Sequence, residues 1–485
     1  MVDSVNALPS NAWDAAFGQG SGTTIEERAR NSRRTFVRSM DQLAFDSGNA
    51  SGQRLTAYEV LRNFGSEKIA EILEHGTAVL VSDPLGPSTQ PGARIRQRRI
   101  DLGLSKRELA NRVNLSEDDL TILEQGASRV PASALARICS ALSLDEYAIG
   151  LEDPSEHARD LGVRFRRLKT DSDRQGFRLD NSSMLSLLED AWIIDKQNEL
   201  HSALSQKSEV SHQISPSPDY GNRGTPAWKI GYELAAKTRR ILGLGPIEPI
   251  ENLRILLESR LQIPLIQDEL NKRIAGATLQ YGDARGIVLN ISGRVYNAWS
   301  ARLTIAHELG HLLWDPDSRL NSLIVDTGDD LDEAPWAANL AVDQRANAFA
   351  IEFLFPRAAV EQRLKGQREP PDDILEFMIE FGVSFTAARY HIWNATYRQW
   401  ELTNLKASAV EPTDDWEARE QFLTTFLPSR ELEEGLSMNR RGNFLAAVMD
   451  AHSQRLISDD TAALYLGVEN HLLKDAREVR KDFFD

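Results

Sequence analysis

The pattern of hydrophobic and polar positions predicts several domains, most of them helical. Residues 93–151 hold short amphipathic stretches, with apolar residues at helical spacing and sharp breaks between them. Helical spacing returns over 161–204, 298–314 and 336–355. Three short β-like runs precede the last two of these, at 263–266, 274–281 and 286–291. The later part of the chain is therefore predicted to be an α+β domain with a small sheet.

Two polar segments rich in Pro, Gly and Ser separate these regions, because such residues break regular structure. We predict a multidomain, mainly α protein with one all-helical module and one α+β domain that carries a small three-stranded sheet. The predicted parts are a helical N-terminal region of unknown role (1–81), a linker (82–92), the all-helical module (93–151), a helical connector (152–205), a second linker (206–225), the α+β domain (226–400) and a helical C-terminal region (401–485).

Composition and charge narrow the class of protein. The 485 residues are 41% hydrophobic and 26% charged, as in globular proteins. The sequence has no apolar stretch of the roughly 20 residues that cross a bilayer and no leader-like start, so we expect a cytoplasmic protein without membrane contact. The net charge of −16 means that any contact with DNA must be local. The single cysteine, Cys139, excludes an internal disulfide and a Cys-based zinc site.

The segment TIAHELGHLL contains the pattern HExxH at His307, Glu308 and His311. Residues four apart lie on one helix face, so both imidazoles can bind one Zn²⁺ ion, and the glutamate can act on a water that the ion activates. With 9 His in the chain, the pattern arises by chance on the order of 0.01 times. The alternative is two core histidines on an amphipathic helix, which would then need other partners.

A catalytic zinc needs a third protein ligand, and we place it in the segment VDQRANAFAIEFLFP. Asp343 shares a helix face with small and apolar residues, which predicts that this face is buried. Glu352 lies about 180° around the same helix and is expected to point to solvent. Asp343 is therefore the predicted ligand. Its alternative role is that of a surface acid near a helix start, where carboxylates are favourable.

The residues from 226 to 397 resemble the ImmA/IrrE family of bacterial and phage metallopeptidases. The likeness rests on five segments in order: LGLGP, AGATLQYGDARGIVLNIS, RLTIAHELGHLLWD, DQRANAFAIEFLFP and FGVSFTAARYHIW. It implies a zincin-like fold and a zinc peptidase that cuts or antagonises a transcriptional repressor during stress or phage induction. The family's third ligand is a glutamate in a segment similar to ExxANxFA. Asp343 stands at that position, which leaves two outcomes: retained zinc, or a domain that senses a partner without cutting it.

Residues 95–144 resemble the Xre-type helix-turn-helix of phage repressors, through LGLSKRELANRVNLSEDDLTILEQG and ASALARICSALSLD. Such domains usually bind operator DNA as dimers, which allows a homodimer here. The expected recognition helix opens with Glu117, Asp118 and Asp119, whose charges oppose DNA entry. Protein recognition is therefore the rival role. The candidate phosphate contacts are basic residues of the neighbouring helices: Arg94, Arg96, Arg98, Arg99, Lys106 and Arg107.

The leading hypothesis is a zinc endopeptidase and regulator whose protein substrate is a transcriptional repressor or another partner. Residues 286–291 are expected to accept substrate backbone as an added strand. Arg389, Tyr390 and His391 are oxyanion candidates only by their proximity to the family-like segment, and structural roles are favoured for them. The alternatives are a DNA-binding regulator with a non-cleaving sensor domain and a component of a toxin–antitoxin pair.

Overall fold

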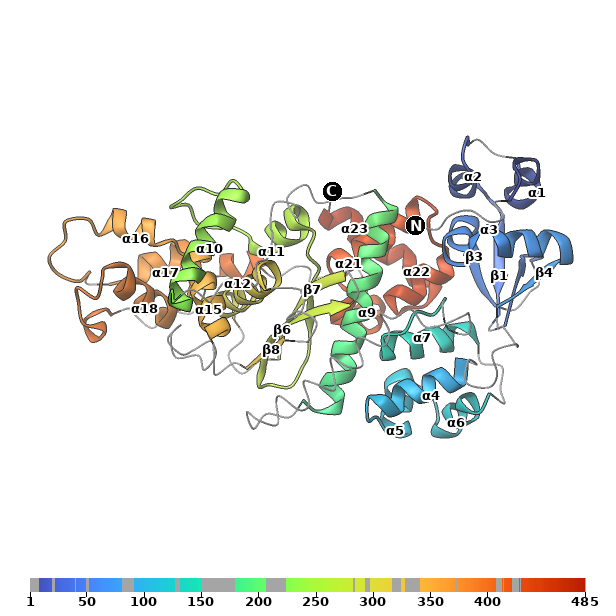
Figure 1. Ribbon diagram of the computed structural model, residues 1–485, viewed down its shortest axis with the longest axis horizontal. Helices are drawn as coiled ribbons and strands as arrows, with labels where there is room; N and C mark the ends of the chain where they lie inside the picture. The colour runs from blue at the N-terminus through green and yellow to red at the C-terminus, as the bar shows by residue number, and fades with distance from the viewer. Residues whose placement is uncertain are drawn as a thin grey trace. The chain divides into compact units, whose positions relative to one another are not determined.

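The computed structural model divides the chain into two compact units (Figure 1). Unit 1 consists of Met1–Gln206 and Thr425–Asp485, and unit 2 of Lys207–Thr424. Unit 2 is thus inserted between two segments of unit 1. The structure describes these residues: 8–19, 22–39, 41–48, 52–80, 91–126, 131–147, 149, 179–205, 224–281, 284–292, 297–315, 324–327, 341–371, 373–406, 412, 414–420, 427 and 429–484.

The N-terminal region of unit 1 contains a sheet, so the prediction that it is simply helical was wrong. The antiparallel sheet has the order β3-β1-β2-β4, and the helix α3 (Ala57–His75) connects β3 to β4. Each strand is four residues long or shorter, which is too little for a clear alternation of apolar and polar positions. The elements are η1 (Ser10–Ala12), α1 (Trp13–Phe17), α2 (Ile25–Asn31), β1 (Thr35–Arg38), β2 (Gln42–Phe45), β3 (Gln53–Thr56) and β4 (Thr77–Val79). Gly65, at φ 76°, interrupts the helical geometry inside α3.

Four short helices follow, in the arrangement expected of a helix-turn-helix. They are α4 (Pro91–Asp101), α5 (Lys106–Val113), α6 (Glu117–Glu124) and α7 (Ala132–Leu142). Ser105 caps α5 in a capping box with Glu108, and Ser116 caps α6 by accepting from the backbone N–H of Asp119. The turn between them passes through Asn114 in the left-handed conformation, with φ 54°. The recognition helix therefore begins where the sequence placed it.

The remaining described helices of unit 1 are α9 (Asn181–Ala203), α20 (Arg430–Gly435), η7 (Met438–Arg440), α21 (Asn443–Ser453), α22 (Asp459–Leu466), η8 (Asn470–Leu472) and α23 (Leu473–Phe484). α9 packs against α7 and α21, so the C-terminal helices close the core of this unit. Most of the predicted linkers, and residues 152–178 of the predicted connector, lie outside the described residues. Pro91 and Gly92, assigned to the first linker, begin α4.

Unit 2 contains a four-stranded mixed sheet in the order β5-β7-β6-β8. The three predicted strands are present as β5 (Leu265–Asp268), β6 (Ile274–Tyr281) and β7 (Ala284–Asn290), and β8 (Ile324–Thr327) joins them beside β6. β7 pairs with β5 on one side and β6 on the other, so its backbone groups are already used. The prediction that residues 286–291 accept substrate as an edge strand was therefore wrong, because an added strand needs an unpaired edge.

The segment with the HExxH pattern is buried between this sheet and neighbouring helices. The chain of unit 2 starts with α10 (Ala227–Ile241), α11 (Leu253–Ile255) and η5 (Leu256–Leu261). After the sheet come α12 (Ala298–Trp314), α15 (Ala341–Leu354), α16 (Arg357–Arg363), α17 (Leu375–Phe381), α18 (Phe385–Ala395), η6 (Leu402–Asn404) and α19 (Asp414–Glu420). α12 packs on β6 and β7 on one side and on α15 on another. No helix in the described part of the chain is long and apolar enough to cross a membrane.

Candidate metal centre

The helix α12 presents His307 and His311 to each other in the interior of unit 2. Asn297 caps the helix in a capping box with Ser300, and nearly all of its side chains are buried, as expected of a helix that is apolar on every face. His307 and His311 have exposed fractions of 1% and 0%. Their Nε2 atoms lie 2.9 Å apart. The structure thus brings together the two metal ligands predicted from the spacing of four.

The second ring nitrogen of each histidine is held by an oxygen atom. His307 Nδ1 lies 2.6 Å from Oδ1 of Asn347, and His311 Nδ1 lies 2.9 Å from Oδ2 of Asp315. Both oxygens accept hydrogen bonds, so each Nδ1 carries the proton and each Nε2 presents a lone pair. Two lone pairs at this distance would repel each other, and a shared proton, or a metal ion bound by both nitrogens in its place, relieves that repulsion. The donor set therefore fits a metal ion that binds imidazole nitrogen.

Glu308 is fully buried and faces the sheet. The hydroxyl of Thr278, on β6, donates a hydrogen bond to Oε2 of Glu308 and lies 3.4 Å from the backbone oxygen of the same residue. Thr278 is itself 3% exposed. A Cβ atom at Gly276, two residues earlier on β6, would lie 3.3 Å from Oε1 of Glu308. The strand therefore holds this carboxylate in one orientation, next to the two imidazoles on the same helix.

Asp315, which directly follows α12, forms an ion pair with α15 and also binds His311. Arg345 on α15 pairs with Asp315, and both side chains of the pair are almost completely buried. Burial lowers the pKa of Arg345 to about 10, which leaves it charged at neutral pH. Neither Asp315 nor Asn347 was among the residues singled out from the sequence. The acid four residues after His311 was a usable signal, because positions i and i+4 are neighbours on a helix.

Asp343 stands one turn before Asn347 on α15 and is half-buried. Its helix face is otherwise buried, as predicted, through Ala346, Asn347, Ala350 and Phe353. Among the described residues, no group of three His, Cys, Asp or Glu side chains is arranged to hold a metal ion. The structure thus brings the two histidines together in the interior of unit 2. The role of Asp343 as third ligand stays a prediction.

Glu352 is buried, so the prediction that it points to solvent was wrong. Its exposed fraction is 6%, and its carboxylate lies 3.2 Å from Nε of Arg357 and 3.4 Å from Nε2 of His391. Burial raises the pKa of Glu352 to about 7 and lowers that of His391 to about 3. α15 is covered by α10 as well as by α12, and Arg357 of α16 and His391 of α18 reach Glu352. His391 is buried beside Glu352, and its structural role stays a prediction.

Two family models match the chain. A helix-turn-helix model matches residues 91–148, and a peptidase family model described as the IrrE N-terminal-like domain matches 286–392. The chain joins a helix-turn-helix domain to an IrrE N-terminal-like domain. Both resemblances seen in the sequence are thereby confirmed, and together they support a regulator with a peptidase-like domain. No curated protein matches the chain.

In the IrrE N-terminal-like domain, Gly310 lets α12 and α15 approach closely at the candidate centre. A Cβ atom at this position would lie 2.9 Å from a ring carbon of Phe349, which is 1% exposed. We expect Gly310→Ala to destabilise unit 2 by about 1–3 kcal/mol, because a packed aromatic ring has to move. Denaturant unfolding of the variant and the wild type measures this. An unchanged denaturation midpoint would show that the ring of Phe349 can move without a loss of stability.

Two of the basic residues that were predicted to contact DNA are buried in the helix-turn-helix domain. Arg98 donates to the backbone oxygen of Leu142, and Arg99 forms a bidentate ion pair with Glu124 at 2.6 and 2.8 Å. Both arginines are 7% exposed and their guanidinium groups are bound inside the domain, so the prediction of DNA contacts was wrong for them. Arg96 and Arg107 are exposed, and Arg94 and Lys106 are half-buried. These four remain the candidate phosphate contacts.

Proposed function

We propose that the IrrE N-terminal-like domain is a zinc-dependent endopeptidase. The observation that carries this proposal is the pair of buried Nε2 atoms, 2.9 Å apart, with each Nδ1 fixed by an oxygen acceptor. This is how proteins orient histidines that bind a metal. His307, His311 and Asp343 would hold the ion. A bound zinc ion would make water acidic enough to attack a peptide at neutral pH and would polarise the scissile carbonyl.

In this proposal Glu308 transfers the protons of the reaction. It lies directly after His307 on the same helix, and Thr278 fixes one of its carboxylate oxygens. Glu308 accepts a proton from the attacking water and then delivers it to the nitrogen of the leaving amine. Asp315 and Asn347 keep both imidazoles in the tautomer that presents Nε2 to the centre. The site therefore has a proton carrier and oriented ligands on one rigid helix.

We further propose that the substrate is a transcriptional repressor or another regulatory protein. A helix-turn-helix domain in the same chain supports this, because it gives the peptidase-like domain a regulatory setting. The experiment is to express wild type and Glu308→Ala in matched cultures and to compare the abundance of all proteins. Proteins lost only with wild type are substrates. If the two proteomes agree while wild-type protein contains zinc, the domain is a non-cleaving sensor.

The exposed acids of α6 favour a second candidate function for the helix-turn-helix domain, the recognition of a protein. Glu117, Asp118 and Asp119 open the recognition helix and are all exposed. Ser116 accepts from the backbone N–H of Asp119, so the N-terminus of this helix is already capped from within the chain. Carboxylates at this end repel the phosphates that flank the major groove.

We expect the triple variant Glu117→Gln, Asp118→Asn, Asp119→Asn to bind non-specific duplex DNA more tightly than wild type, because three negative charges are removed. Titrations at several salt concentrations measure the affinity and its salt slope. Arg96→Gln is the matched control and should weaken binding, since Arg96 is exposed on α4. The opposite result would be tight, sequence-specific binding by wild type that the triple variant loses. It would show that the three acids contact the bases directly.

A further inference from the structure

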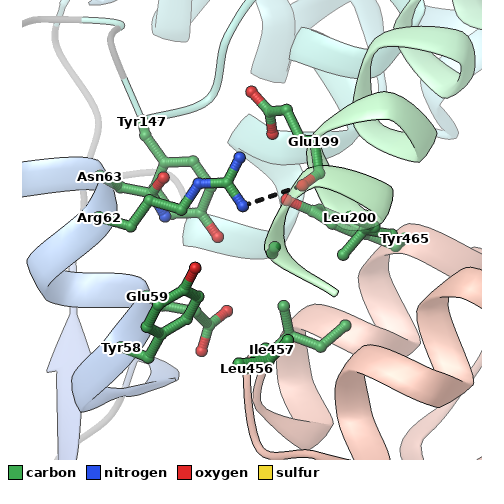
Figure 2. Close-up of a pocket in the computed structure, with 11 residues that line it drawn as sticks. Tyr58, Glu59, Arg62, Asn63, Tyr147, Glu199, Leu200, Leu456, Ile457 and Tyr465 are labelled. Carbon is green, nitrogen blue, oxygen red and sulfur yellow. Dashed lines mark hydrogen bonds between the residues drawn. The ribbon is translucent and has the colours of Figure 1, made fainter. Parts of the chain in front are cut away.

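Unit 1 contains a cavity at the junction of four segments that are distant in sequence (Figure 2). Tyr58, Glu59 and Arg62 come from α3, and Tyr147 comes from the end of the helix-turn-helix domain. The rest of the lining comes from α3, from the end of α9, from the loop after α21 and from α22. These further residues are Asn63, Glu199, Leu200, Ala203, Leu456, Ile457 and Tyr465. The cavity volume is about 20 Å³, enough for one or two groups the size of a water molecule.

Two buried polar atoms at this cavity lack a hydrogen-bond partner in the described part of the chain. They are Oε1 of Glu59 and the hydroxyl of Tyr147, whose residues are 3% and 4% exposed. The other oxygen of Glu59 accepts from the backbone N–H groups of Thr56 and Ser458, at 2.6 and 3.0 Å. Leaving such groups unsatisfied costs about 1–3 kcal/mol each. An occupant that hydrogen-bonds both of them therefore stabilises the unit.

The charged groups that line the cavity indicate which kind of ligand it can bind. In Figure 2 the carboxylate of Glu59 and the hydroxyl of Tyr58 point into the same space, with the guanidinium of Arg62 on its other side. Arg62 is solvent-exposed and donates from Nη1 to the backbone oxygen of Glu199, at 3.1 Å. The enclosed end thus offers a carboxylate and hydroxyl oxygens. The exposed rim offers the cation of Arg62, while the carboxylate of Glu199 beside it is paired with Lys196 at 3.2 Å. Burial raises the pKa of Glu59 to about 7, so a cation beside it would relieve an unfavourable charge.

We propose that this cavity binds the zwitterionic head of a small α-amino acid. The ammonium group occupies the enclosed end and donates to Glu59 and to the hydroxyl of Tyr147. The carboxylate lies at the rim against Arg62, and the side chain extends toward solvent. Tyr147 lies within the residues matched as a helix-turn-helix domain, so the ligand contacts that domain directly. This site is independent of the proposed peptidase and would exist without it.

The test is isothermal titration of the full-length protein with L-alanine, ethylamine and propionate. Ethylamine lacks the carboxylate of alanine, and propionate lacks its ammonium group. We expect one binding site for L-alanine, and binding weaker by about tenfold or more for each of the other two, since each loses one charged contact. Ethylamine or propionate that binds as well as L-alanine would overturn the assignment of that charge. No binding of L-alanine would overturn the proposal.

Two variants locate the site. Tyr147→Phe removes only a hydroxyl that no described residue binds, so the fold is kept, and Arg62→Gln changes an exposed side chain. Both should weaken L-alanine binding by about threefold to tenfold, the effect of one lost hydrogen bond. Arg33→Gln, another exposed arginine of unit 1, is the matched control and should bind as wild type does. Wild-type affinity in both cavity variants would place the binding elsewhere and overturn the proposal.

Discussion

Glu308→Gln should keep its zinc and lose peptide hydrolysis by about 10²–10⁴-fold, the usual contribution of a general base. The amide has the shape of the carboxylate and can still accept the hydrogen bond that Thr278 donates, so the fold around it is preserved. It cannot take up the proton of an attacking water. The measurements are metal content by mass spectrometry and cleavage of a substrate found in the proteome comparison.

A matched control separates this loss from a general effect of removing a carboxylate. Glu361 lies on α16 in the same unit and is exposed, so Glu361→Gln should leave both zinc content and rate unchanged. Thr278→Ser is informative as well, because serine retains the hydroxyl that orients Glu308 and should retain most of the activity. If Glu308→Gln cleaves at the wild-type rate, Glu308 has no part in the reaction.

Asp343→Ala should lose most of the bound zinc. If Asp343 is the third ligand, the variant retains two histidines, and a site that lacks one of its protein ligands binds the ion far more weakly. Zinc content at matched protein concentration, after dialysis against a weak chelator, measures the loss. Equal zinc in variant and wild type would exclude Asp343 as a ligand.

The structure also decides how the Asp343 experiment is controlled. Glu352 on the same helix is unsuitable, because its removal would leave Arg357 and His391 without a buried partner. The exposed Glu361 serves instead, and Glu361→Ala should keep its zinc. Asp343→Glu then tests the geometry. A rise in zinc affinity would indicate a site weakened by the shorter acid, and a fall would indicate a backbone adapted to aspartate.

Sequence spacing predicted the features that depend on one helix at a time. The interval of four between His307 and His311 places both rings on one face whatever surrounds the helix, and the structure confirms that they meet. The caps Ser105 and Ser116 likewise act within their own turns, so the helix-turn-helix was recognisable from its residues. The strands β5, β6 and β7 were found because each is a short apolar run between turn residues.

Only the tertiary structure decided which side chains from different segments meet. Asn347 reaches His307 across 40 positions of the sequence, and Thr278 reaches Glu308 across 30. Helical periodicity cannot show that α10 packs along α15 or that Arg357 and His391 reach Glu352, which is buried. Nor can a strand's own residues show whether it has one neighbour or two, as β7 does. Local patterns reflect the geometry of single elements, whereas burial and pairing depend on contacts between elements, and these are formed only when the chain packs.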